Sequence, residues 1–297
     1  MSDDARPEPG TITWSTLWAQ TAAIVGDRVR ARWLCEVASG VDGDEFRAVL
    51  DEPATERMVH HLDAMLERLR AGEPLQYVLG RWAFRRLDLM VDPRVLIPRP
   101  ETEQVAEVAL AHARARRSAN RRPMRLADLG TGSGAIGLSL ADELGADGLE
   151  VWLTDASADA LDVARANLAG LGRAGAAVRL AHGDWFDALP VEHRGDFSVI
   201  VSNPPYVLDD DPRLEPIVRE WEPAGALFAG SDGLDAVRRL VRGAGEWLEP
   251  DGVLVLEIGA DQGDAAAALM SEAGLVHVRI HPDLAGHDRV AEGRLVE

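Results

Sequence analysis

Asp128-Leu129-Gly130-Thr131-Gly132-Ser133-Gly134 joins a predicted strand at 125–129 to a predicted helix at 134–145. Glycines allow a tight turn and let a ligand approach the backbone closely, and the helix that follows presents free N–H groups. A dinucleotide-binding turn has the spacing G-x-G-x-x-G, whereas this turn has G-x-G-x-G. The pattern favours a cofactor without a pyrophosphate, although a plain strand-to-helix connection has the same appearance.

Strands and helices alternate from this turn to the end of the chain, which predicts an α/β fold with a Rossmann-like, mostly parallel sheet. The predicted strands are 125–129, 150–154, 177–181, 197–202, 252–258, 275–281 and 289–296. The predicted helices are 134–145, 157–170, 234–248 and 262–273. The last two strands leave no room for a crossover helix, so we expect the last strand to run antiparallel after the loop 282–288.

Ligand-type residues also follow three later strands of the predicted sheet. Asp155 ends the second strand, Asp184-Trp185 follows the third, and Asn203 ends the fourth. Open α/β sheets bind ligands at the carboxyl ends of their strands, and a carboxylate about 20 residues beyond the last glycine can accept both hydroxyls of a ribose. Asp184 and Trp185 can flank an adenine. Asp155 as a helix cap and Trp185 as a core residue are the alternatives, but the coincidence at four strand ends favours a site.

Asn203-Pro204-Pro205-Tyr206 directly follows the apolar run 197–202. Two consecutive prolines cannot donate ladder hydrogen bonds, so the strand must end there. An Asn amide, a rigid backbone and a Tyr ring are then left at the edge of the sheet, a group suited to holding a planar, weakly nucleophilic NH2 of an amide or a base. Asn-Pro also marks ordinary turns, which is the alternative interpretation.

The region before the α/β domain divides into three parts. Residues 1–12 are polar, acidic and Pro-rich, which predicts a disordered tail. Residues 13–71 are predicted to form a small helical domain, because Leu62, Met65, Leu66 and Leu69 recur at helical spacing. Residues 72–98 are predicted to be a hairpin linker that ends at Asp92-Pro93, and the α/β domain occupies 99–297.

The composition limits the partners and the compartment. The 297 residues carry a formal net charge of −19, and such an acidic surface repels phosphate backbones, so we expect no direct binding of nucleic acid. The single cysteine excludes an intrachain disulfide, and no His or Cys spacing is typical of a metal site. The first residues lack an apolar signal core and no apolar run is long enough to cross a bilayer. A cytoplasmic, metal-free protein without membrane contact is the expectation.

These motifs together resemble those of class I S-adenosylmethionine-dependent methyltransferases. More narrowly, the chain is similar to the protein-(glutamine) N5 methyltransferases that modify peptide-chain release factors, and the resemblance extends from about residue 14 to the end. The glycine-rich turn occurs in many methyltransferases and the Asn-Pro-Pro-Tyr group also in adenine methyltransferases. The narrower resemblance is carried by Leu96-Ile97-Pro98-Arg99-Pro100-Glu101-Thr102-Glu103 and by Asp283-Leu284-Ala285-Gly286-His287-Asp288-Arg289. A departure from the family is Ala83, where Glu commonly precedes the Phe of the hairpin.

The resemblance implies an enzyme that methylates the glutamine of the Gly-Gly-Gln loop of release factors and so tunes translation termination. The helical N-terminal domain would help to recognise that protein. Gly130, Thr131, Gly132, Ser133 and Gly134 would then line the methionine and ribose of S-adenosylmethionine. Asp155 would hold the ribose hydroxyls, and Trp185 with Asp184 would contact the adenine. The product of the cofactor is S-adenosylhomocysteine, and no metal is implied.

The residues 203–206 would hold the substrate glutamine. In the mechanism that we expect, Asn203 and the carbonyl of Pro204 accept the two N–H groups of the amide, and Tyr206 packs on the amide plane beside Pro205. Asn203 also borders the cofactor. No general base is evident. Arg99 is expected to pair with Glu101 or Glu103, and contact with the carboxylate of the cofactor is the alternative.

Three other functions are compatible with the sequence. A glutamine methyltransferase of a ribosomal protein has nearly the same motifs. An amino methyltransferase of nucleic acid needs an extruded base and a basic docking surface, which the charge of −19 opposes. A non-catalytic cofactor-binding protein has no need of the Asn-Pro-Pro-Tyr group.

Overall fold

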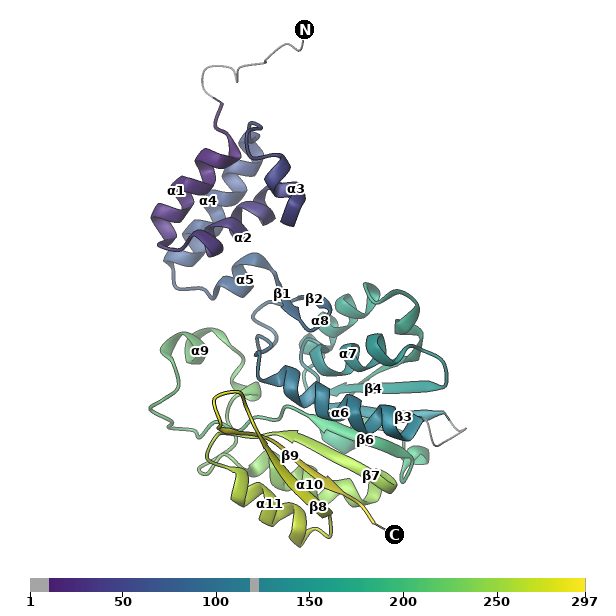
Figure 1. Cartoon of the computed structure of the whole chain (residues 1–297). Helices are drawn as coiled ribbons and strands as arrows, with labels where there is room; N and C mark the ends of the chain where they lie inside the picture. The colour runs from purple at the N-terminus through teal and green to yellow at the C-terminus, as the bar shows by residue number, and fades with distance from the viewer. Residues whose placement is uncertain (1–10, 118–122, 297) are drawn as a thin grey trace. The chain divides into compact units, whose positions relative to one another are not determined.

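The computed structural model describes residues 11–117 and 123–296. The chain divides into two compact units, one up to Gly80 and one from Arg81 to Glu297 (Figure 1). The division falls inside the range 72–98, for which the sequence predicts a linker. Residues 1–10 of the predicted disordered tail lie outside the described residues, as do residues 118–122.

The N-terminal unit is helical. Its helices are α1 (Trp14–Val25), α2 (Arg28–Ser39), α3 (Gly43–Ala48), α4 (Glu56–Arg70) and α5 (Leu75–Leu79). Side chains of Thr13, Asp27 and Thr55 accept hydrogen bonds from the first-turn amides of α1, α2 and α4, and so satisfy donors that have no partner inside the helix. Apolar residues at helical spacing, including Leu62 and Met65, form a separate core in this unit.

The second unit begins with a short antiparallel hairpin, β1 (Arg81–Phe84) and β2 (Leu87–Met90). Asn167 fastens the hairpin to α8 (Ala158–Ala169): its Oδ1 accepts from the Met90 amide at 2.7 Å, and its Nδ2 donates to the Met90 carbonyl at 3.1 Å. The same Nδ2 donates to the Ser133 carbonyl at 2.9 Å. One half-buried side-chain amide therefore joins the hairpin, the helix and the glycine-rich turn.

A seven-stranded sheet forms the centre of the second unit within the described residues, in the order β5-β4-β3-β6-β7-β9-β8. The strands are β3 (Met124–Leu129), β4 (Leu149–Asp155), β5 (Val178–His182), β6 (Phe197–Ser202), β7 (Leu248–Glu257), β8 (Val276–Pro282) and β9 (Asp288–Arg294). β3 to β7 pair in parallel, whereas β9 is antiparallel to both β7 and β8. The predicted mostly parallel sheet with an antiparallel last strand is confirmed.

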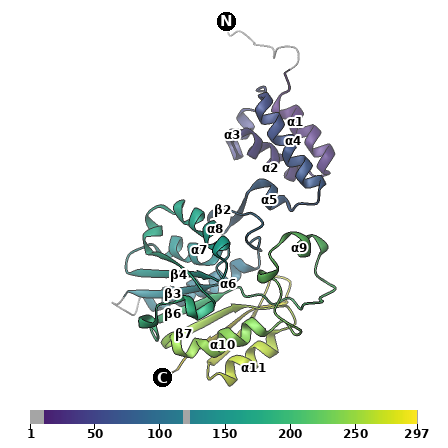
Figure 2. The same ribbon diagram turned by 180° about the vertical axis from the view of Figure 1, so that it is seen from behind.

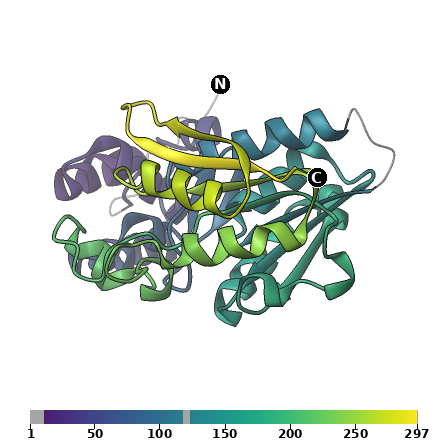
Figure 3. The ribbon, with the colours of Figure 1, turned by 90° about the horizontal axis from the view of Figure 1, so that it is seen from below.

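Helices cover both faces of this sheet, as expected for a parallel sheet whose strands are apolar on both sides. α6 (Thr102–Arg117) and α7 (Ala135–Leu144) pack with β3, β4 and β6 in one core, and α6 lies in front of the sheet in Figure 1. α10 (Asp235–Trp247) and α11 (Gly263–Glu272) pack in a second core on the opposite face, and Figure 2 shows α10 from that side. Figure 3 shows the two layers with the sheet between them.

The predicted elements match the observed ones closely, with one larger difference at β7. This strand begins at Leu248 rather than at the predicted residue 252. Leu248 pairs with Phe197, and the register then shifts before Val253 pairs with Val199. Asp251, at φ 61°, lies in this irregular stretch. A turn signal at Pro250-Asp251 can therefore sit inside a strand when a bulge absorbs the extra residues.

Candidate active site

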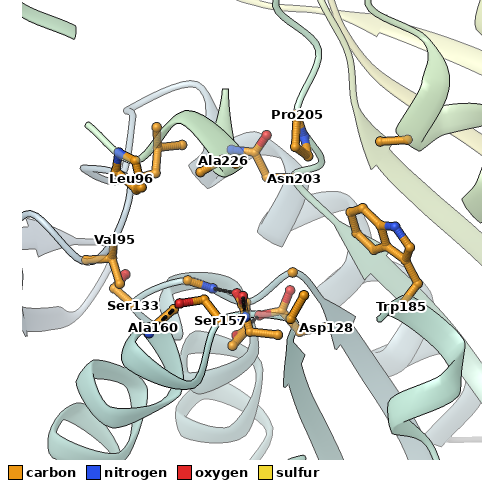
Figure 4. A pocket seen from close by; sticks show the side chains of 18 of the residues that line it. Val95, Leu96, Asp128, Ser133, Ser157, Ala160, Trp185, Asn203, Pro205 and Ala226 are labelled. Carbon is orange, nitrogen blue, oxygen red and sulfur yellow. Dashed lines mark hydrogen bonds between the residues drawn. The ribbon is translucent and has the colours of Figure 1, made fainter. Parts of the chain in front are cut away.

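A cavity of about 680 Å³ lies at the carboxyl ends of β3, β4 and β6, within the range of about 300–1,000 Å³ that is usual for small-molecule sites. The strand order reverses between β4 and β6 on either side of β3, and open α/β sheets bind their ligands at such a point. In Figure 4, Asn203 and Pro205 lie on one side of the cavity and Asp128 and Ser133 on the opposite side.

The glycine-rich turn lines one wall of this cavity. Its glycines at 130, 132 and 134 have φ values of 72°, 55° and 87°, a region that residues with a side chain rarely adopt. The amides of Gly130 and Thr131 both donate to the Thr154 carbonyl, at 2.9 and 2.8 Å, so the turn is fastened to the end of β4. These two hydrogen bonds fix the turn beside the cavity, and no ligand is needed to form them.

Asp128 is a buried carboxylate at the base of the turn. Its Oδ2 accepts from Thr131 Oγ1 at 2.6 Å and from the Gly137 amide at 2.8 Å. Its Oδ1 is buried without a hydrogen-bond partner among the described residues, and Asp128 lines the cavity. Burial raises the pKa of Asp128 to about 6 against the opposing hydrogen bonds. A cationic group of a ligand would complete the hydrogen bonding of this carboxylate and favour its ionised form.

Asp155 ends β4 beside the turn. Its Oδ2 accepts from the Gly132 amide and its Oδ1 from the Ser157 amide, both at 2.9 Å. Burial raises the pKa of Asp155, while these backbone hydrogen bonds act to lower it. Each carboxylate oxygen keeps a further lone pair, so the group can accept two hydroxyls from a ligand in the cavity.

In Figure 4, Trp185 lies at the opposite end of the cavity from Ala160 of α8 and from Ser157, the residue that caps this helix. A side-chain carbon placed on Gly130 would come within 3.2 Å of the indole ring, so the glycine permits the close approach of ring and turn. Trp185 itself has φ 51° and belongs to a short 3-10 helix, Trp185–Ala188. Asp184 pairs with Arg239 at 2.7 Å, and both residues line the cavity. The indole therefore offers an apolar wall next to the turn.

Asn203 and Pro205 contribute the wall opposite Asp128 and Ser133. The chain leaves β6 after Ser202, whose hydroxyl donates to the Leu129 carbonyl at 2.5 Å and so ties the end of β6 to the end of β3. Asn203 Nδ2 donates to Thr102 Oγ1 at 3.3 Å. No described residue donates a hydrogen bond to Asn203 Oδ1, which leaves this acceptor for a ligand.

The other two residues of this motif do not line the cavity. Pro204 is buried, and the hydroxyl of Tyr206 donates to Glu257 Oε1 at 3.2 Å. The Tyr206 hydroxyl therefore points toward the end of β7, and the packing of its ring on a substrate amide stays a prediction. Pro204 can still contribute through its backbone.

Most of the residues predicted from the sequence meet in this one cavity. Those that line it are Gly130, Thr131, Gly132, Ser133, Asp155, Asp184, Trp185, Asn203 and Pro205, whereas Gly134, Pro204 and Tyr206 do not. Gly134 precedes α7, and a side chain on it would clash with Leu138 at 2.7 Å, so its absence of a side chain serves packing.

Two parts of the wall contain none of the site residues predicted from the sequence. The segment with Arg94, Val95, Leu96 and Pro98 lines the cavity, as does the segment around Pro223. Arg99 pairs with Glu222 at 2.5 Å, not with Glu101 or Glu103, and the Ile97 amide donates to the same carboxylate at 3.1 Å. Glu222 is buried, so this pair joins the two segments at the rim of the cavity. The Pro-Arg-Pro-Glu-Thr stretch, which begins at Pro98, could have indicated the first segment from the sequence.

The part of the chain that the structure describes holds no group of three or more His, Cys, Asp or Glu side chains arranged for a metal ion. Nor does any helix in residues 11–117 and 123–296 have the length and apolar character needed to cross a membrane.

The chain matches two models of known domains. The model described as Methyltransferase small domain matches residues 110–218, and the model described as PrmC N-terminal domain matches residues 14–80. A 16S rRNA methyltransferase of T. thermophilus, solved in complex with AdoMet and guanosine, has a TM-score of 0.50, is 19% identical, and covers 72% of this chain and 49% of that chain. At that identity the likeness shows the fold alone.

The fold and the cavity define a class I methyltransferase. The release factor glutamine methyltransferase of Xylella fastidiosa (strain 9a5c) is 44% identical over 247 residues, which are 82% of this chain and 84% of that protein. The protein of the same name from Bordetella pertussis is 45% identical over 244 residues, 82% of this chain and 85% of that protein. The chain belongs to the family of release factor glutamine methyltransferases, as the resemblance of its motifs predicted.

Proposed function

We propose that the protein transfers a methyl group from S-adenosylmethionine to the side-chain amide nitrogen of the glutamine in the Gly-Gly-Gln loop of peptide-chain release factors. The observation that carries this proposal is that the glycine-rich turn and Asp155 line the same cavity as Asn203 and Pro205. Membership of the release factor glutamine methyltransferase family supplies the substrate. The net charge of −19 opposes a nucleic-acid substrate.

The residues of the cavity fit the cofactor. The unpartnered Oδ1 of Asp128 suits the positively charged amino group of its methionine part, and Asp155 suits the ribose hydroxyls. Trp185 supplies an apolar wall for the adenine. When bound, S-adenosylmethionine supplies an electrophilic methyl group on a positively charged sulfur. The cavity thus offers a complementary group for each part of the cofactor.

The protein's task is to hold and orient a poor nucleophile, because the lone pair of an amide nitrogen is delocalised. Asn203 Oδ1 and the Pro204 carbonyl accept the two N–H groups of the glutamine amide. These acceptors fix the plane of the amide and stabilise the positive charge that grows on its nitrogen. Alignment of nitrogen with the methyl carbon, at about 3 to 3.5 Å, captures the advantage of an intramolecular reaction. The proton leaves to water after transfer. The helical N-terminal unit contributes to recognition of the release factor.

The test uses S-adenosylmethionine with a labelled methyl group. The purified protein is incubated separately with release factor, ribosomal proteins, RNA and DNA. We expect label in the release factor only. Label in a ribosomal protein or in nucleic acid, with none in the release factor, would replace the proposed substrate, and no transfer to any of them would refute the activity.

The affinity for S-adenosylmethionine is expected to depend on pH through Asp128. The pKa of this carboxyl in the free protein is raised to about 6, so below that pH a proton must be released before the cofactor's amino group can pair with it. The dissociation constant should therefore rise about tenfold between about pH 7 and about pH 5. Because folding raises the pKa of Asp128, its contribution to the free energy of unfolding of the cofactor-free protein is greatest at low pH. That contribution is lost as pH rises through about 6.

Calorimetric titration of the protein and of Asp128→Asn at each pH measures this effect. The variant should lose most of the pH dependence, with a residual part from Asp155, whose pKa is also raised. An equal pH dependence in both proteins would show that Asp128 does not pair with the cofactor.

A further inference from the structure

Gln262, the residue before α11, connects three parts of the chain near the end of the Asn-Pro-Pro-Tyr motif. It is 5% exposed and does not line the cavity. Its Nε2 donates to the carbonyls of Tyr206 at 3.2 Å and Gly233 at 3.1 Å, across 56 and 29 residues of sequence. Its Oε1 accepts from the Gly259 amide at 2.8 Å. One buried side chain therefore joins the motif to the loop before α10 and to the turn after β7.

These three partners fix the orientation of the Gln262 carboxamide. Its oxygen can only accept from an N–H group, and its nitrogen can only donate to a carbonyl. A reversed carboxamide would place NH2 against the Gly259 amide and oxygen against two carbonyls, without a hydrogen bond in any of the three places. The packing is also close, because a side-chain carbon on Gly233 would come within 2.4 Å of the Tyr206 carbonyl oxygen and 2.7 Å of Gln262 Nε2. The surroundings therefore favour a glutamine in one orientation.

The Tyr206 carbonyl matters because the residues before it form a stiff segment. A proline ring fixes φ, and a residue that precedes a proline is restricted as well, so residues 203–205 have few free torsion angles. The position of such a segment is set by its two ends. At the first end the Ser202 hydroxyl donates to the Leu129 carbonyl at 2.5 Å, and at the other end Gln262 holds the Tyr206 carbonyl. Release of either end would let the whole segment shift.

We propose that Gln262 is a positioning residue that, by holding the Tyr206 carbonyl, places the two acceptors of the substrate amide. These acceptors are Asn203 Oδ1 and the Pro204 carbonyl. The inference rests on the proposed function, because it assigns the placement of both acceptors in that reaction. Gln262 does not line the cavity, and the residues proposed to hold the cofactor lie in the glycine-rich turn and at the end of β4. Its effect is therefore on the rate of methyl transfer rather than on the binding of S-adenosylmethionine.

The first test is Gln262→Met, which keeps the size of the side chain but removes its carboxamide. Single-turnover methyl transfer to release factor at saturating cofactor should be slowed about tenfold, because a misplacement of about 1 Å costs about 100-fold and a smaller one costs less. The dissociation constant for S-adenosylmethionine, measured by calorimetry, should change less than about threefold. The matched control is Gln104→Met, the same exchange at a half-buried residue that donates to the Pro282 carbonyl and does not line the cavity. This control should react at the rate of the unchanged protein.

The second test is a double-mutant cycle. In Asn203→Ala one of the two acceptors is already absent, so adding Gln262→Met should slow methyl transfer by less than about threefold further. A full tenfold additional loss would show that Gln262 acts independently of Asn203 and would overturn the proposal. Thermal unfolding verifies that each variant is folded. If the methionine variant does not fold, Gln262→Glu carries both tests, because it keeps the shape and the acceptor for the Gly259 amide but loses the NH2 group.

The remaining outcomes separate this inference from the proposed function. If the unchanged protein does not methylate release factor, the proposed function fails and the role of Gln262 fails with it. If it does methylate release factor but Gln262→Met reacts as fast as Gln104→Met, only the role of Gln262 is refuted. A loss of cofactor affinity equal to the loss of rate would also refute it, because Gln262 would then support the cavity as a whole rather than the two acceptors.

Discussion

Asn203→Ala is expected to lower kcat for methylation of release factor on the order of 100-fold, the usual effect of removing one polar group that stabilises charge in a transition state. In the proposed reaction, Asn203 Oδ1 accepts one N–H of the glutamine amide, and no described residue donates to it in the free protein. Without it, the amide can rotate away from the methyl group, and the positive charge on nitrogen loses a stabilising dipole. Single-turnover methyl transfer at saturating cofactor measures the effect.

Cofactor binding separates this role from a general disturbance of the cavity. The dissociation constant for S-adenosylmethionine should change less than about threefold in Asn203→Ala, because the residues proposed to hold the cofactor, such as Asp128, lie on the opposite wall. Gln104→Ala is the matched control: it removes the carboxamide of a half-buried residue near the start of α6, which does not line the cavity and donates to the Pro282 carbonyl. Turnover in Asn203→Ala equal to that of the control would contradict the proposed role.

Asp155→Ala should produce the largest loss of cofactor affinity. Its carboxylate accepts the amides of Gly132 and Ser157 and has lone pairs left for the two ribose hydroxyls. Hydrogen bonds to a charged group contribute about 1.5 to 3 kcal/mol each, so loss of the pair should raise the dissociation constant for S-adenosylmethionine at least about 100-fold. The kcat at saturating cofactor should fall much less, because Asp155 does not touch the reacting atoms.

Asp159→Ala is the control for this variant. Asp159 lies in the first turn of the same helix, α8, but it is exposed and does not line the cavity. Its removal tests the loss of a negative charge near the site, and we expect an affinity close to that of the unchanged protein. If both variants bound the cofactor equally well, Asp155 would have no part in holding it.

Local signals explain why the sheet could be predicted from the sequence. The end of β6 at Ser202 follows from the two prolines after Asn203, and β4 ends at Asp155 as its apolar pattern stops. Parallel strands then bring Asp155, Trp185 and Asn203 to one edge without further information, since their carboxyl ends all lie there. The convergence of these residues in one cavity could therefore be foreseen.

The details of the walls depend on contacts between residues distant in sequence. Arg99 and Glu222 are 123 residues apart, and Asn203 and Thr102 are 101 apart. Nearby acids at 101 and 103 were equally plausible partners for Arg99 by sequence, and only packing selects the buried Glu222. The unpartnered Oδ1 of Asp128 likewise cannot be predicted from the sequence motif. The motif does not show that the turn donates its hydrogen bonds to Oδ2 alone.

In the proposed reaction, the cofactor's methyl group is directed at a glutamine amide held by Asn203 and Pro204. Mass spectrometry of release factor after incubation with the protein and S-adenosylmethionine tests it most directly. We predict the added mass of one methyl group, located by fragmentation on the side-chain nitrogen of the glutamine in the Gly-Gly-Gln loop. A methyl group on any other residue, or an unchanged release factor with active cofactor turnover elsewhere, would contradict the account.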